Sequence, residues 1–207
     1  ADPAPVHVLI VGTAATNAVV GRIGDDVAVF HCLEWFKTPG GARILTGHET
    51  THAWHLLQMP AAPPDGVPAW TAFSEGLAIQ VSRKAVPDQK EDDYFWYGLP
   101  RFGGWLEYCR ANRDDLHDRL AKSLDDPAGA EAMFDGTPSE GPPRVGYFVA
   151  DELVGGLGRT PSELVRLSVD DATAAIRSAL TTAKPKATAK KPAGGAAKPS
   201  KRGKKSA

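Results

Sequence analysis

The pattern of apolar and polar positions divides the chain into a short β-rich part and a longer helical part. Residues 6–11 form a brief apolar run, and residues 17–36 carry β-branched clusters around Gly24 and the Asp25-Asp26 turn. Short apolar runs bounded by turn residues are typical of strands. We therefore expect a small N-terminal sheet of two or three strands.

The periodicity changes after Thr38-Pro39, a pair that suits a helix cap followed by the first helical position. Residues 42–59 no longer alternate, which predicts a helix that ends before Pro60. A second helix is expected over 69–85, because apolar side chains recur there at spacings of three and four. Further helices are expected over 101–124, 143–156 and 161–180, with loops around Pro127, 136–138 and 155–156. Strands followed by helices indicate an α+β fold with helices dominant.

Charge separates the chain into two unequal parts. The whole chain of 207 residues has a formal charge of −1, from 24 cations and 25 anions. Nine of the cations lie between Lys184 and Lys205, in a segment without Asp or Glu, so residues 1–180 carry a net charge of −10. Because Lys, Ala, Pro and Gly dominate from Thr181 onward, we expect a domain over 1–180 and a disordered basic tail over 181–207.

Composition excludes two classes of protein. No apolar run approaches the roughly 18 residues that a membrane span requires. Two cysteines, Cys32 and Cys109, cannot form a disulfide framework in a chain of this length, and we expect both to be free core residues. The tail favours a cytoplasmic protein, although Ala1 in place of Met is compatible with secretion.

The segment with the clearest chemistry is His48-Glu49-Thr50-Thr51-His52, within the first predicted helix. Helical positions i and i+4 differ by about 40° and about 6 Å, so both imidazoles can converge on one ion. Two nitrogen ligands in this arrangement suit Zn²⁺. Glu49 lies beside the same face, where a general base could reach an attacking water. A helix with surface histidines and no metal is the alternative interpretation.

A two-histidine site needs a third protein ligand, and the next predicted helix offers Glu75. Gly76 follows it and would let two helices approach closely. Taken alone, Glu75 could equally face solvent.

These two motifs together resemble the gluzincins, the zinc metallopeptidases of thermolysin-like fold. The run from Val6 to about Leu157 also resembles a bacterial family of predicted Zn-dependent proteases whose function is uncharacterised. The shared features are the two metal motifs, a Gly-Arg-Ile strand at 21–23, an aromatic segment at 94–98, and Arg144-Val145-Gly146-Tyr147. The resemblance implies that His48, His52 and Glu75 ligate zinc and that Glu49 activates water.

Two features depart from the thermolysin pattern. The position four residues after Glu75 holds Ile79, where such enzymes carry an Asp that orients a zinc ligand. We therefore expect another acceptor, such as a backbone carbonyl. We also expect the substrate-binding Asn-Ala strand of these enzymes to be missing, which leaves the substrate open.

Other side chains are candidates for supporting roles. Tyr147 is the candidate donor to an oxyanion, since Gly146 clears space beside it; a tyrosine packed in the core is the alternative. Tyr97 and His117 are weaker candidates, and His117 lies among acidic residues as surface histidines often do. His55 lies about 10 Å along the helix from His48, too far to share an ion easily, and is expected to line a pocket or the core.

The sequence therefore predicts a zinc-dependent metallohydrolase, most simply a peptidase acting on a peptide or protein. The alternative is a catalytically inactive protein of zincin fold that binds a partner. In either case the basic tail could attract nucleic acid or acidic partners without reading bases.

Overall fold

The computed structural model describes residues 4–12, 16–59, 63, 66–99, 103–134 and 141–182. Three strands form one sheet, β1 (Val6–Ile10), β2 (Ala18–Ile23) and β3 (Asp26–Cys32). The central strand, β3, is parallel to β1 and antiparallel to β2. Gly24, with a φ of 61°, begins the tight turn between β2 and β3, as a two-residue hairpin loop with glycine first requires. Within the described residues, β2 therefore has one free edge.

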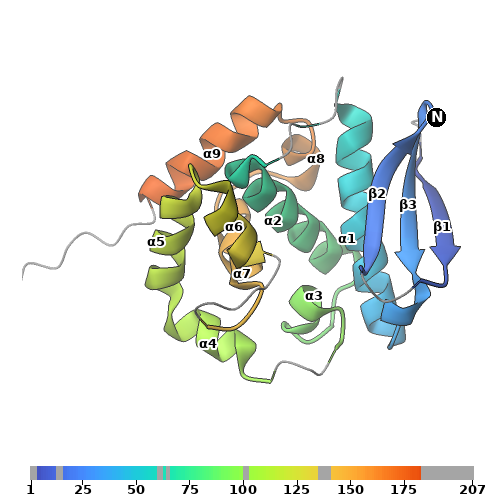
Figure 1. The fold of residues 1–207 in the computed structure, drawn as a ribbon, viewed down its shortest axis with the longest axis horizontal. Coiled ribbons are helices and arrows are strands. Elements are labelled where there is room, and N and C mark those ends of the chain that lie inside the picture. Colours follow the sequence, from blue (N-terminus) through green and yellow to red (C-terminus); the bar gives the residue numbers. More distant parts are fainter. Residues whose placement is uncertain are drawn as a thin grey trace, which may run out of the picture.

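Helices make up most of the remaining described chain (Figure 1). They follow the short 3₁₀ turn η1 (Leu33–Trp35) in the order α1 (Pro39–Gln58), α2 (Pro68–Ala85), α3 (Asp93–Trp96), α4 (Trp105–Ala111), α5 (Arg113–Ser123), α6 (Pro127–Phe134), α7 (Val145–Gly155), α8 (Pro161–Leu164) and α9 (Val169–Thr182). The expected α+β class, with a small N-terminal sheet and dominant helices, is confirmed.

Local signals define both ends of α1. The Thr38 hydroxyl accepts a hydrogen bond from the Gly41 amide at 3.0 Å, and Pro39 occupies the first helical turn, where its missing N–H costs nothing. At the other end Met59 is extended, with φ −98° and ψ 137°, because the proline that follows it in the sequence disfavours helical backbone.

The first helix lies between the sheet and the other helices (Figure 1). A small buried cluster joins it to the sheet, with Val27 and Val29 from β3 and Ala53 from α1. The larger core lies on the opposite side of α1, where α2 packs against α1, α7 and α9. The helix α1 thus belongs to two cores.

Close packing fixes α2 against α7. A Cβ at Gly76 would lie 2.3 Å from the Ala150 carbonyl oxygen, so this approach requires glycine. One turn further on, Gln80 donates a hydrogen bond to the Asp151 carboxylate at 2.6 Å, and Arg83, two turns on, donates two more at 2.9 and 2.8 Å. The expected close approach at Gly76 is confirmed, but the helix that approaches is α7.

Two of the expected long helices are interrupted. The 101–124 helix divides into α4 and α5 at Asn112, whose side chain bonds the Tyr108 carbonyl at 2.8 Å and competes with the helical backbone. The 161–180 helix divides into α8 and α9, because Ser168 caps a new helix by accepting from the Asp171 amide.

Two further elements are helical where no helix was expected. Pro127 was expected in a loop but begins α6, a position that proline favours. The single turn of α3 ends at Tyr97, which is left-handed with a φ of 54°.

The helix α9 continues to Thr182, two residues past the expected domain end. The remainder of the basic tail, 183–207, lies outside the described residues. In the part of the chain that is described, no helix has both the length and the apolar character needed to cross a membrane. Cys32 and Cys109 are buried and unpaired, as expected.

Candidate metal centre

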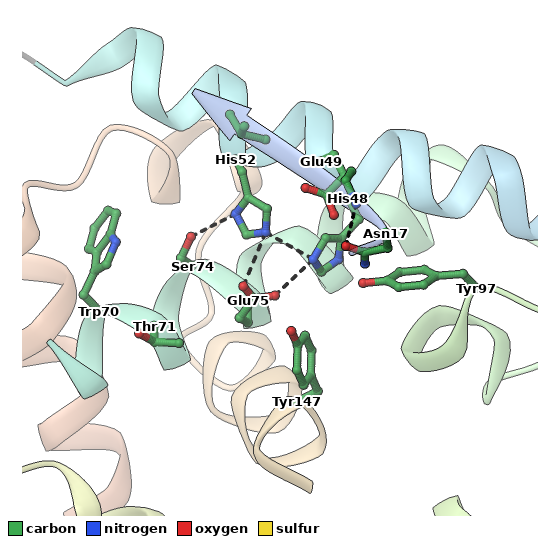
Figure 2. Close-up of a pocket in the computed structure, with 12 residues that line it drawn as sticks. Asn17, His48, Glu49, His52, Trp70, Thr71, Ser74, Glu75, Tyr97 and Tyr147 are labelled. Atoms are coloured by element: carbon green, nitrogen blue, oxygen red, sulfur yellow. Dashed lines mark hydrogen bonds and ion pairs between the residues drawn. The ribbon is translucent and has the colours of Figure 1, made fainter. Parts of the chain in front are cut away.

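Three potential ligands converge between α1 and α2 (Figure 2). His48 Nε2 lies 3.1 Å from His52 Nε2 and 3.0 Å from Glu75 Oε2, while His52 Nε2 lies 3.5 Å from Glu75 Oε1. The histidines are one turn apart on α1, and Glu75 faces them from α2. The structure therefore brings together all three residues that the sequence predicts as metal ligands.

The donor set fits zinc. Four ligands at about 2.1 Å in a tetrahedron lie roughly 3.4 Å from one another. The three observed separations, 3.0, 3.1 and 3.5 Å, are close to that value. Two nitrogens and one carboxylate are also the protein ligands of a catalytic zinc site, in which a fourth coordination position stays open for water or substrate. A cavity lies beside the three donors here.

The charges of these side chains are coupled. Burial lowers the pKa of His52, but the nearby carboxylates of Glu75 and Glu49 outweigh it and raise that pKa to about 9. Burial would raise the pKa of Glu75, but His52 and His48 hold it well below its usual range. These carboxylates thus favour a proton on His52, which a metal ion bound there would have to displace.

Ser74 orients one of the two histidines. Its hydroxyl lies 3.0 Å from His52 Nδ1, which directs Nε2 toward Glu75. For His52 the expected alternative to the Asp of thermolysin-like enzymes is therefore a serine hydroxyl, and not the backbone carbonyl given as an example. The serine precedes Glu75 directly and therefore faces α1 with it. His48 Nδ1 is buried and has no hydrogen-bond partner among the described residues. Position 79, where thermolysin-like enzymes carry the orienting Asp, holds a buried Ile.

Glu49 lies beside the three donors without joining them. It is 7% exposed and lines the same cavity, with its carboxylate next to His48 (Figure 2). Among the described residues it accepts no hydrogen bond. A carboxylate that is buried and accepts no hydrogen bond from the protein is suited to accept a proton from a water molecule in the cavity.

Two tyrosines complete the wall opposite α1. The Tyr97 ring lies 5.6 Å from the His48 ring, and the Tyr147 ring lies 6.5 Å from it. Both hydroxyl groups point toward the space beside His48 and Glu75 (Figure 2). Burial raises the pKa of Tyr97, and burial together with Glu75 raises the pKa of Tyr147. Both phenols therefore stay protonated at neutral pH and can donate hydrogen bonds.

The cavity has a volume of about 310 Å³ and reaches from these tyrosines to the first residues of β2. A second cavity, of about 380 Å³, adjoins it and follows β2 past Val20 and Arg22 toward the end of α1. Asn17 and Ala18 line the first cavity, at the beginning of the free-edged strand. The expectation that an Asn-Ala strand is missing was therefore wrong: the pair stands 31 residues before His48.

The remaining histidine candidates lie away from the donors. His55 is buried against Trp70, with ring centres 4.7 Å apart, and lines the second cavity as expected. Burial and the neighbouring His52 lower the pKa of His55 to about 4, so it is neutral. His117 is buried on α5 and pairs with Glu152 at 2.8 Å, so the expectation of a surface histidine was wrong.

Models of known protein families, curated proteins and solved structures were all compared with the chain, and none matches it. The resemblance to gluzincins therefore rests on the residues of the site.

Proposed function

We propose that this protein is a zinc-dependent metallohydrolase of the gluzincin type, and specifically a peptidase. The observation that carries the proposal is the convergence of His48, His52 and Glu75 within hydrogen-bonding distance of one another. Glu49 beside them adds a base in the position that hydrolysis requires. The order of elements, with a sheet on one side of the ligand helix and a second helix bringing the carboxylate, supports a thermolysin-like arrangement.

In the proposed reaction the chain supplies the base and the hydrogen-bond donors. Zinc, held by His48, His52 and Glu75, would polarise the scissile carbonyl and acidify water. Glu49 accepts a proton from the attacking water and later donates it to the leaving amine. The Tyr147 hydroxyl donates a hydrogen bond to the carbonyl oxygen as negative charge develops on it, and Tyr97 lies close enough to assist.

The free edge of β2 supports a peptide as the substrate. An extended peptide can add to an exposed strand edge through main-chain hydrogen bonds. The first cavity holds the donors and the start of this strand, and the second follows the strand to Arg22. The Asn17 side chain is at the start of the strand, where it could hold a further amide of the substrate. A main-chain binding mode of this kind favours peptides over small esters or amides.

Metal analysis tests the proposal first. After mild supplementation the purified protein should retain about one equivalent of Zn²⁺, and His48→Ala should lose it. His55→Leu is the matched control, because His55 is on the same helix but outside the donor set, and it should keep the ion. A zinc content below about 0.2 equivalents that His48→Ala does not change would overturn the proposal.

Turnover separates an enzyme from a binding protein. Glu49→Gln should retain zinc but abolish cleavage of a peptide library. Zinc binding without cleavage by the wild-type protein would instead support the inactive zincin-fold alternative. Deletion of 183–207 should leave the zinc content unchanged and remove any salt-dependent retention on nucleic acid.

A further inference from the structure

Arg144 lies directly behind the two tyrosines of the candidate site. Its guanidinium carbon is 4.1 Å from the centre of the Tyr147 ring, 5.4 Å from that of Tyr97 and 5.0 Å from that of Trp96. One of its terminal nitrogens donates a hydrogen bond to the Tyr97 hydroxyl at 3.3 Å. The cation thus contacts both phenols that face His48 and Glu75.

The charge of Arg144 is satisfied in an unusual way. Among the residues that the structure describes, no carboxylate forms an ion pair with it, and the side chain is only partly exposed. Its contacts are instead the faces of aromatic rings and one phenol oxygen, which attract a planar guanidinium. Arg83, in contrast, combines its contact with a tyrosine ring with an ion pair to Asp151.

The backbone at both contacting residues is left-handed. Arg144 has a φ of 61° and Tyr97 a φ of 54°, and only Asp88 shares this property among the other described non-glycine residues. Such conformations cost free energy for a residue with a Cβ and concentrate where function over-determines the geometry. The Tyr97 carbonyl lies against Gly41 of α1, where a Cβ would be 1.9 Å from the carbonyl oxygen, so this approach requires glycine.

This backbone geometry connects Arg144 with both tyrosines. The residue precedes α7, and its carbonyl accepts a hydrogen bond from the Tyr147 amide at 3.2 Å. Its side chain then folds back over the Tyr147 ring and reaches Tyr97, which follows α3. A single side chain therefore joins the α3 and α7 sides of the site.

We infer that Arg144 is a positioning residue that holds the Tyr97 and Tyr147 hydroxyls toward the carbonyl oxygen of a bound peptide. The inference rests on the proposed hydrolase function and deepens it. Arg144 itself does not line the cavity, so it acts through the tyrosines. Loss of the guanidinium should let both rings move, which weakens donation to the transition state more than binding of the substrate.

Two substitutions isolate this role. Arg144→Asn removes the guanidinium but tolerates the left-handed backbone, and Arg144→Lys keeps a charge but loses the planar group. We expect kcat to fall at least about tenfold in Arg144→Asn, with KM within about twofold and the zinc content unchanged. Arg83→Lys is the matched control, because Arg83 also covers a tyrosine ring, at 5.1 Å from the centre of Tyr94, but outside the site. It should lower stability without lowering kcat.

A double-mutant cycle decides between positioning and a general structural role. In a protein that already carries Tyr97→Phe and Tyr147→Phe, Arg144→Asn should change kcat by less than about twofold, because the groups it positions are gone. A full tenfold loss in that background, or a change confined to KM, would overturn the inference.

A readout independent of turnover uses the zinc-free protein. Arg144→Asn should alter its near-ultraviolet circular dichroism, which reports on the packing of tyrosines, while the far-ultraviolet spectrum stays the same. An unchanged near-ultraviolet spectrum would also count against the inference. Failure of the proposed function is recognised separately, by a zinc content that His48→Ala does not change or by the absence of peptide cleavage in the wild-type protein.

Discussion

Two helix glycines near the metal ligands should respond in opposite directions to the same substitution. Gly47 is in the middle of α1 and Gly76 in the middle of α2, so replacement by Ala improves helix propensity at both by about 1 kcal/mol. At Gly47 the new methyl group would lie 3.6 Å from Ser82, an ordinary contact. Gly47→Ala should therefore increase the free energy of unfolding by about 0.5–1 kcal/mol.

At Gly76 the methyl group would meet atoms that cannot yield easily. It would lie 2.3 Å from the Ala150 carbonyl oxygen and 2.7 Å from Val154 Cγ2, so α7 must move away from α2. Overpacking of this kind costs about 1–3 kcal/mol or more, which exceeds the gain in propensity. We expect Gly76→Ala to lower the free energy of unfolding by about 1–2 kcal/mol, so that the two variants differ by about 1.5–3 kcal/mol.

Urea unfolding of the zinc-free proteins, followed by circular dichroism, measures this difference. Chelator is included because bound zinc would add its own stabilisation. The midpoint should shift upward for Gly47→Ala and downward for Gly76→Ala, at an unchanged slope. If Gly76→Ala is as stable as the wild-type protein, the close approach of α2 and α7 is not a constraint on this fold, and the placement of Glu75 opposite α1 needs another explanation.

Three further predictions concern the surroundings of the site. Ser74→Ala should weaken zinc binding by about tenfold or more, because it frees the His52 ring, as competition with a chelator of known affinity would reveal. His55 stays neutral in the folded protein down to about pH 4, whereas an unfolded histidine takes up a proton below about 6.5. Folding stability should therefore fall as the pH drops from 6.5 toward 4, and His55→Leu should reduce this slope; a slope equal to that of the wild-type protein would contradict the assignment. Asp151→Ala should cost about 2–3 kcal/mol by leaving the partly buried Arg83 without a carboxylate, and a urea midpoint within error of the wild type would exclude this.

Much of the candidate ligand set could be predicted because its signals are local. The i, i+4 spacing of His48 and His52 fixes their common direction once a helix forms, and Thr38-Pro39 fixes where that helix begins. Glu75 was identified as the next available carboxylate on a helix. Its position opposite His48 depends on the packing of α1 against α2, which spacing alone does not determine.

The features that sequence reasoning missed depend on contacts between distant segments. The parallel pairing of β1 with β3 leaves β2 at an edge, and only this topology gives Asn17-Ala18 a place beside the donors. Arg144 was noted only as part of a weak motif, since nothing local indicates that its side chain reaches Tyr97. The break at Asn112 did have a local signal, a side chain able to compete for backbone hydrogen bonds, which the apolar periodicity on both sides obscured.

Because α1 packs in two cores of unequal size, the two sides of the molecule should differ in their resistance to local unfolding. Three fully buried residues form the cluster between the sheet and α1, whereas the metal ligands belong to helices of the much larger core. Partial unfolding should therefore release the sheet before the helices, so that backbone amides of β2 exchange with solvent faster than those of α2. In such a partly open state the donors of His48, His52 and Glu75 stay together while the strand edge is lost. For the proposed peptidase, metal retention and peptide capture would then have different thermal limits, with capture failing first.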